Sequence, residues 1–261
     1  TLSATPDSFN LLILYTGNTL GELKPCGCSR EEDQGGIERR GTYLKETRQS
    51  AKNILLVDTG DSFKEPSIQG KLKGQTLMQS MSHWNYDAVV IGEKDLIYGN
   101  RFLSGEKPIP WLAANLELEG SENLPGYRIK NFDNGLKVAM LALVDPELFY
   151  AGTHGGLRVK DPDETLKKLL SEIQRSEKPN LVVLLTHMPR DKALKFLDVD
   201  AVDVVINGHI ENDTAEIDMT PVKKPGKIFV QPSSKGQKVG ELRVSINPQG
   251  EKTFEQQMVK L

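Results

Sequence analysis

Short runs of apolar residues, several of them rich in Val, Ile and Leu, recur along the chain. They lie at residues 10–17, 53–61, 87–92, 137–145, 180–187 and 202–209. Each run closes with Gly, Asp or His, and an unbroken apolar run of this kind is typical of a strand that is buried on both faces. The pattern therefore predicts a series of buried strands.

Segments with a helical pattern separate these runs. They lie at residues 35–49, 74–84 and 161–180. The last is the clearest, because it has an acidic start, apolar residues three or four apart from Leu166 to Ile173, and a stop before Pro179. Strands that alternate with helices place the chain in the α/β class and indicate a largely parallel, buried sheet.

The last part of the chain has a different pattern. Apolar and polar residues alternate across residues 227–261, and Gly-containing turns interrupt them, which predicts antiparallel strands. The sequence shows no internal repeat, no low-complexity linker and no strong boundary signal. We therefore expect one domain, residues 1–261.

Composition and charge exclude two classes of function. Apolar residues make up 38% of the chain and charged residues 26%, which is ordinary for a globular protein. The net charge is −3, and Lys and Arg form no dense block, so we do not expect nucleic acid as a partner. The longest apolar runs, such as residues 138–144, are far shorter than the ~20 residues of a transmembrane helix, so no transmembrane segment is predicted.

The chain opens with neither Met nor an apolar segment. Such a start is typical of a mature chain from which a signal peptide has been removed, so we expect a periplasmic or extracellular protein. The two cysteines, Cys26 and Cys28, are not a disulfide framework and fit either redox compartment.

Potential metal ligands stand where four of the predicted strands end. They are Asp58, Asp61, Glu93, Asp95, His187, His209 and Glu211. In parallel α/β sheets the crevice outside the carboxyl ends of the strands is where ligands bind. Any one of these residues could instead cap a helix or close a turn. Because the pattern repeats at four strands, we expect these side chains to converge on one rim.

The same segments resemble the calcineurin-like metallophosphoesterases, and within them the 5′-nucleotidase branch. The motifs that carry the resemblance, in order along the chain, are LYTGNTLGEL (14–23), GGIERRGTYLK (35–45), DTGDSF (58–63), GEKDLIYG (92–99), IPWLAANLE (109–117), LLTHM (184–188) and NGHIE (207–211). The resemblance covers nearly the whole chain. It implies a four-layer α/β/β/α sandwich, in which two mixed sheets are flanked by helices.

The resemblance also implies phosphate-ester hydrolysis at a two-metal site. Carried over residue by residue, it assigns one metal to Asp61, Glu93, His187 and His209. Two imidazoles and two carboxylates are a credible ligand set for Zn, Mn or Fe. We therefore expect one tightly held divalent transition metal, and a small anionic substrate or a partner protein that carries the reacting group.

Two departures from the family's motifs change the expected chemistry. The second metal would fall to Asn18, Leu20, Asp61 and Glu211, of which Leu20 cannot ligate and Asn18 is a weak donor. Lys94 stands where the family has its catalytic histidine, and a lysine is a poor general acid near neutral pH. Lys94 could hold an anion as a point charge, or form an ion pair with Glu93 or Asp95.

The functional expectations stay open between three alternatives. The first is a one-metal hydrolase of a phosphate or related oxyanion ester; some relatives of this family cleave sulfur esters carried by a partner protein. The second is a catalytically inactive, metal-holding binding or assembly module. The third is a redox protein that uses Cys26 and Cys28, which could also bind a metal, attach a lipid or a partner, or be unremarkable surface thiols. The C-terminal domain with which 5′-nucleotidases bind the base is not expected within this chain.

Overall fold

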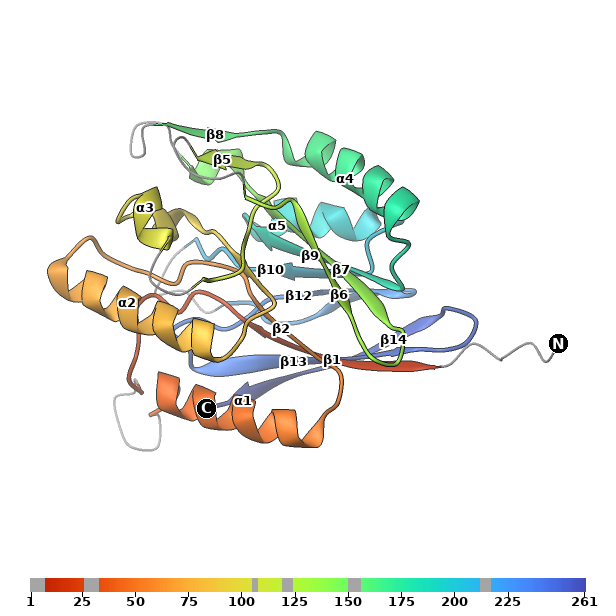
Figure 1. The fold of residues 1–261 in the computed structure, drawn as a ribbon, viewed down its shortest axis with the longest axis horizontal. Coiled ribbons are helices and arrows are strands. Elements are labelled where there is room, and N and C mark those ends of the chain that lie inside the picture. Colours follow the sequence, from red (N-terminus) through yellow and green to blue (C-terminus); the bar gives the residue numbers. More distant parts are fainter. Residues whose placement is uncertain (1–7, 26–32, 105–107, 119–123, 150–155, 212–216) are drawn as a thin grey trace.

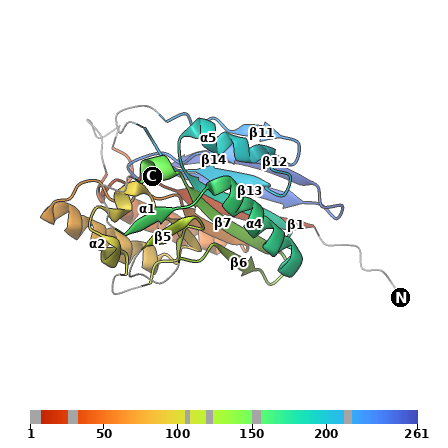
Figure 2. The same cartoon turned by 90° about the horizontal axis from the view of Figure 1, so that it is seen from above.

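Two six-stranded mixed sheets pack face to face, and helices lie against their outer faces (Figures 1 and 2). The structure is a computed structural model, and it describes residues 8–25, 33–104, 108–118, 124–149, 156–211 and 217–261. The arrangement confirms the predicted α/β class and the sandwich of two mixed sheets flanked by helices.

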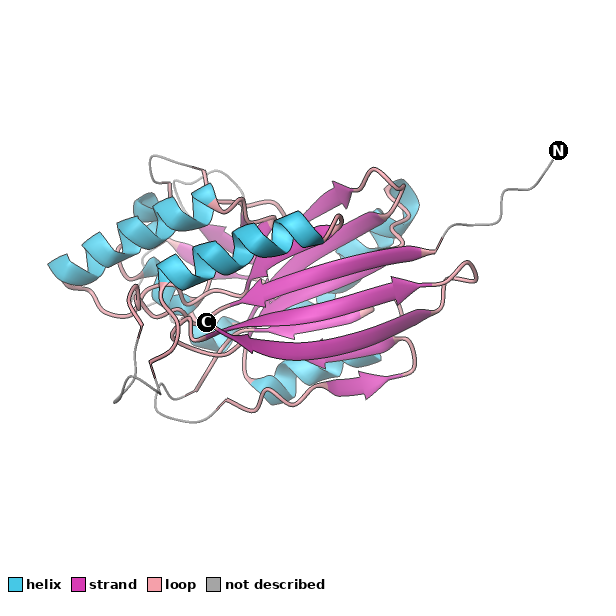
Figure 3. Cartoon of the chain, turned by 90° about the horizontal axis from the view of Figure 1, so that it is seen from below, coloured by secondary structure: helices cyan, strands magenta, loops and turns pink. Residues whose placement is uncertain are grey.

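The first sheet has the strand order β14-β13-β1-β2-β3-β4. Its strands are β1 (Phe9–Thr16), β2 (Ile54–Asp58), β3 (Ala88–Val90), β4 (Trp111–Leu112), β13 (Lys238–Ile246) and β14 (Lys252–Lys260). Strands β1 to β4 are parallel, whereas β13 runs antiparallel to β1 and to β14. Helices α1 (Ile37–Ser50) and α2 (Ile68–His83) lie over part of the outer face and leave β13 and β14 without a helix over them (Figure 3).

The second sheet has the strand order β11-β12-β10-β9-β7-β6. Its strands are β6 (Tyr127–Asn131), β7 (Lys137–Val144), β9 (Leu181–His187), β10 (Val204–Asn207), β11 (Val222–Lys224) and β12 (Lys227–Val230). The four central strands are parallel, and β6 and β11 add antiparallel edges. Helices α4 (Pro162–Ser176) and α5 (Arg190–Leu194) cover its outer face (Figure 1).

Strand β7 shows why its sequence is apolar throughout. Val138 and Met140 belong to the core between the two sheets, while Ala139 and Leu141 belong to a second core under the helices. Successive side chains of a strand point to opposite faces, so a strand with a core on each side needs apolar residues at every position.

Shorter elements complete the described chain. They are the 3₁₀ turns at Glu93–Leu96, Pro146–Leu148 and Lys195–Asp198, helix α3 (Asn100–Leu103), and a two-stranded sheet of β5 (Leu116–Leu118) and β8 (Leu157–Val159). Within the described residues, no helix is long and apolar enough to cross a membrane.

The sequence alone left two details of the strands unresolved. The stretch 109–117 holds β4 and the start of β5, because Asn115 turns the chain between them and its side chain bonds both the N–H and the C=O of Val144. The tail is antiparallel in β13 and β14, as predicted, whereas β12 is antiparallel to β11 on one side and parallel to β10 on the other. The alternation of apolar residues reports which face is buried, but it does not report the direction of the neighbouring strand.

Candidate metal centre

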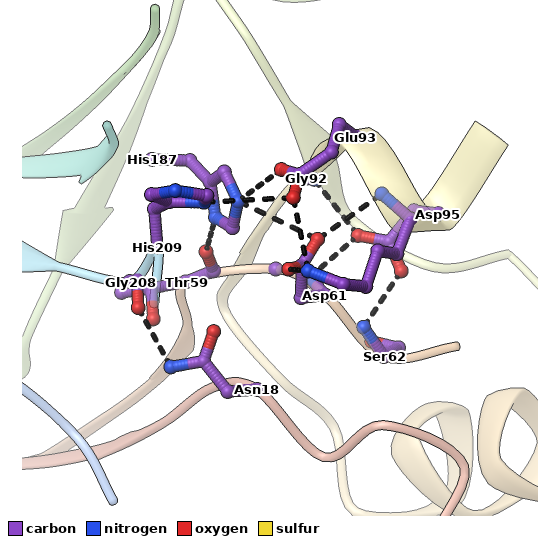
Figure 4. A network of polar contacts seen from close by, with 12 residues as sticks. Asn18, Thr59, Asp61, Ser62, Gly92, Glu93, Asp95, His187, Gly208 and His209 are labelled. Carbon is purple, nitrogen blue, oxygen red and sulfur yellow. Dashed lines mark hydrogen bonds and ion pairs between the residues drawn. The ribbon is translucent and has the colours of Figure 1, made fainter. Parts of the chain in front are cut away.

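Four potential ligands from the two sheets meet at the carboxyl ends of the strands (Figure 4). Asp61 follows β2 and Glu93 follows β3 in the first sheet, while His187 ends β9 and His209 follows β10 in the second. One ligand atom from each lies within 4.8 Å of all the others. The structure thus brings together the four residues that the resemblance assigned to one metal.

The backbone around Asp61 is held in an unusual conformation. Asp61 has a φ of 57°, in the left-handed region that non-glycine residues rarely occupy. The Asp95 carboxylate accepts hydrogen bonds from the backbone N–H groups of Asp61, Ser62 and Gly92 at 2.8–2.9 Å. Burial, followed by the nearby Asp61 charge, raises the pKa of Asp95 to about 7. Asp95 thereby joins the loops that carry Asp61 and Glu93.

His187 is fully buried, and its orientation is fixed by the backbone. Its Nδ1 lies 2.7 Å from the carbonyl oxygen of Thr59, which can only accept, so Nδ1 donates and Nε2 faces the cluster. Nε2 lies 2.7 Å from Glu93 Oε2 and 3.4 Å from Asp61 Oδ1. Burial would lower the pKa of His187, but the Asp61 and Glu93 carboxylates outweigh it and raise that pKa to about 9. A proton on Nε2 is therefore favoured wherever no metal ion takes its place.

His209 carries the fourth potential ligand atom. Its buried Nδ1 lies 3.5 Å from Glu93 Oε1, too far for a good hydrogen bond, and no hydrogen-bond partner for it is found among the described residues. A buried imidazole nitrogen without a partner is costly unless an ion or another group completes the site.

Two of the separations between potential ligand atoms suit a tetrahedral ion, whereas the 2.7 Å between His187 Nε2 and Glu93 Oε2 is the length of a hydrogen bond. Metal–ligand bonds of ~2.1 Å imply separations of about 3.4 Å between neighbouring ligand atoms of a tetrahedral site. The separations of 3.4 Å from His187 Nε2 to Asp61 Oδ1 and 3.5 Å from His209 Nδ1 to Glu93 Oε1 have this size. The unpartnered His209 nitrogen and the mixed nitrogen and oxygen donors together fit a divalent transition metal.

Lys94 adds a positive charge beside these ligands. Its Nζ donates to Asp61 Oδ2 at 2.6 Å and to Glu93 Oε1 at 3.0 Å, and its backbone N–H donates to Asp61 Oδ1 at 3.1 Å. Burial would lower the pKa of Lys94, but the Asp61 and Glu93 charges outweigh it and raise that pKa above its usual value. Of the two ion pairs considered from the sequence, the one with Glu93 forms. The second partner is Asp61 and not Asp95.

Known proteins with similar sequences support the resemblance. No protein-family model matches the chain. A snake venom 5′-nucleotidase from Naja atra is 28% identical over 220 residues, which are 77% of this chain and 41% of that protein. The chain thus spans about two fifths of the length of this curated relative. This chain is a relative of the 5′-nucleotidases.

Solved structures show that the fold is shared as well. A 5′-nucleotidase precursor from Thermus thermophilus has a TM-score of 0.81 at 22% identity, and the match covers 97% of this chain and 55% of that one. The calcineurin-like phosphoesterase YfkN from Bacillus subtilis has a TM-score of 0.71 at 20% identity, with 97% and 91% covered. The 5′-nucleotidase relative therefore has the metallophosphoesterase fold.

Of the residues assigned to a second metal in this 5′-nucleotidase relative, Asn18, Leu20 and Glu211 lie outside the four-residue cluster. Asn18 is buried, its Nδ2 donates to the Gly208 carbonyl at 2.6 Å, and its Oδ1 has no partner in the part of the chain that the structure describes. Leu20 is buried and apolar, and Glu211 is exposed and does not belong to the four-residue cluster. Cys26 and Cys28 lie outside the described residues, so their assignment to redox chemistry or metal binding stays a prediction.

Sequence reasoning missed the role of two carboxylates in this 5′-nucleotidase relative. Asp58 and Asp95 both stood among the potential ligands at strand ends. Asp58 instead accepts from the Thr16 hydroxyl and the Gly60 N–H, and Asp95 binds backbone N–H groups only. A carboxylate that organises a loop and one that faces a metal have the same signature in sequence.

Proposed function

We propose that this chain is a hydrolase of phosphate or related oxyanion esters that works with one divalent transition metal, Zn, Mn or Fe. The observation that carries the proposal is the convergence of Asp61, Glu93, His187 and His209 from four strands of two sheets. The kinship with 5′-nucleotidases supports the reaction class. The metal, when bound, would supply Lewis-acid activation and a water of lowered pKa.

Three groups of the protein have separate roles around the metal ligands. Thr59 orients His187 through Nδ1, and Asp95 holds the loop on which Asp61 lies. Lys94 stands at the position of the family's general acid, but a lysine ammonium, with an ordinary pKa of about 10.4, is too weak an acid near neutral pH to protonate a leaving group. We therefore expect hydrolysis to favour esters whose leaving groups need no protonation.

The choice of substrate is part of the proposal. Nucleotides are suggested by the names of the relatives, but the chain spans only about two fifths of the snake venom relative. A generic small oxyanion ester is the better-supported class, because the described site offers cationic and metal-binding groups and these recognise the anion. We also propose a location outside the cytoplasm, which the venom relative supports.

The first test is metal content together with turnover. Elemental analysis should find close to one tightly bound transition metal per chain, and p-nitrophenyl phosphate should be hydrolysed. His209→Ala should lose both, since removing one of four ligands cripples a site of fixed geometry. His83→Ala, which changes an exposed histidine, is the matched control. Two tightly bound metals per chain would contradict the one-metal proposal.

The same test separates the second candidate function. A metal-holding binding or assembly module is favoured by Lys94 at the acid position and by the apolar Leu20. That alternative predicts one metal per chain and no turnover of any aryl ester.

The role of Lys94 in leaving-group chemistry has its own test. Lys94→His restores a group with a pKa near neutrality, so hydrolysis of alkyl phosphates should rise relative to p-nitrophenyl phosphate, by up to roughly 100-fold. An unchanged ratio would show that residue 94 does not lie beside the leaving group.

A further inference from the structure

Lys94 shares both of its carboxylate partners with the candidate metal site. Its Nζ binds Asp61 Oδ2 and Glu93 Oε1, while the other oxygens, Asp61 Oδ1 and Glu93 Oε2, face His187 Nε2 at 3.4 and 2.7 Å. Each carboxylate thus offers one oxygen to the ammonium group and the other to His187, and Glu93 Oε1 lies near both Lys94 Nζ and His209 Nδ1. We therefore expect the ammonium group and a metal ion to share these two carboxylates.

We infer that the Lys94 ammonium replaces the charge of the second metal ion and binds a substrate oxyanion beside the retained metal. The inference deepens the proposed function and rests on its one-metal site. It makes the centre a metal–ammonium pair, joined by the two carboxylates of Asp61 and Glu93.

The hydrogen-bonding capacity of Lys94 leaves room for a ligand. An ammonium group has three donors, and the two carboxylates use two of them. Among the described residues no third acceptor is found for Nζ, and the side chain is 22% exposed. The remaining donor is therefore free for an oxygen of a bound anion, which a lysine holds as a point charge.

The state of the second-metal position agrees with this assignment. Leu20 supplies no ligand atom, and the Asn18 side-chain amide donates a hydrogen bond to the Gly208 carbonyl. A phosphoryl group bound to a single metal would lack the second positive charge that a two-metal site supplies. The Lys94 ammonium contacts two of the four clustered ligands, so it is placed to supply that charge.

The test measures binding of inorganic phosphate by titration calorimetry, with metal content followed by elemental analysis. Lys94→Met keeps the length of the side chain and removes its charge, and Lys94→Arg keeps the charge. Lys192→Met is the matched control, because Lys192 also bridges two carboxylates, Asp145 and Glu147, both at 2.7 Å, outside the cluster.

The expected result is that Lys94→Met retains one metal per chain and binds phosphate roughly 10- to 100-fold more weakly, the loss expected for one charge-assisted hydrogen bond. Lys94→Arg should stay within a few-fold of the wild type, and Lys192→Met should match it. Metal affinity should not fall in Lys94→Met, since a neighbouring positive charge has been removed.

Several outcomes would overturn the inference. They are unchanged phosphate affinity in metal-loaded Lys94→Met, two tightly bound metals in the wild type, or no bound metal at all. The last outcome also ends the proposed function. Phosphate binding that depends on Lys94 without any ester turnover would support the inference while the proposed hydrolysis fails, so the two failures are distinguishable.

Discussion

At the scale of single residues, the candidate site depends on a side chain that is not itself one of the four potential metal ligands. Asp95 is buried, and both of its carboxylate oxygens are used by backbone N–H groups of Asp61, Ser62 and Gly92. The left-handed backbone of Asp61 would otherwise be an unfavourable conformation. The position of one ligand is therefore set by a carboxylate that ligates nothing.

Asp95→Asn tests this role, because asparagine has the same shape but replaces one acceptor by an NH₂ donor. That donor would face a backbone N–H, so we expect a loss of about 1–3 kcal/mol in the free energy of unfolding. We also expect metal affinity to weaken at least several-fold. Chemical denaturation and metal titration at pH 8, above the Asp95 pKa of about 7, measure both.

Asp203→Asn is the control for Asp95→Asn. Asp203 accepts from the Val182 N–H at 2.8 Å and pairs with Lys252 at 3.1 Å, and it does not belong to the cluster. It should lose stability without losing metal affinity. If Asp95→Asn retained wild-type metal affinity, Asp95 would be a stabilising residue only.

At the scale of elements, the site depends on how closely three strand ends approach one another. Gly92 connects β3 to the turn that begins at Glu93, and a Cβ there would lie 2.6 Å from the Asp61 N and 2.8 Å from His187 Cε1. Its φ of −87° is open to any residue, so space and not backbone conformation requires glycine.

Gly92→Ala should therefore push the ends of β2, β3 and β9 apart. We expect metal affinity to fall at least tenfold, and overpacking to cost about 1–3 kcal/mol in the free energy of unfolding. Gly126→Ala is the control, since its Cβ would lie 3.2 Å from the flexible end of the Leu169 side chain and 3.6 Å from Ala114 Cβ, which is ordinary contact distance. Equal metal affinity in the two variants would show that the strand ends tolerate a methyl group.

The helices and strands also show how much of the fold could be predicted from the sequence. Apolar runs and helical periodicity located the buried strands and helices α1, α2 and α4, because burial dictates composition directly. The split of residues 109–117 was not predictable, since it depends on the bonds of Asn115 to Val144 across the fold. In the same way, the four clustered ligands followed from motifs at strand ends, but Asp95 could not be separated from them without its partners.

At the scale of the whole molecule, the candidate site joins the two sheets. Asp61 and Glu93 follow strands of the first sheet, whereas His187 ends one strand of the second sheet and His209 follows another. The core between the sheets is continuous, with buried residues such as Leu56 on one side and Val183 on the other. A metal ion held by all four side chains would therefore stabilise the packed sandwich and not either sheet alone.

Thermal unfolding with and without metal tests this conclusion. A ligand that binds only the folded state at 100 times its Kd adds about 2.7 kcal/mol, which raises Tm by roughly 5–10 °C in a chain of this size. Tryptophan fluorescence reports the first sheet's side of the molecule through Trp84 and Trp111, whereas far-UV circular dichroism reports both sheets.

Because the metal would link the sheets, both signals should shift together in one transition. His83→Ala should shift as the wild type does, and His209→Ala should not shift. If fluorescence and circular dichroism separated on adding metal, the sheets would be unfolding independently, and the four ligands would not share one ion.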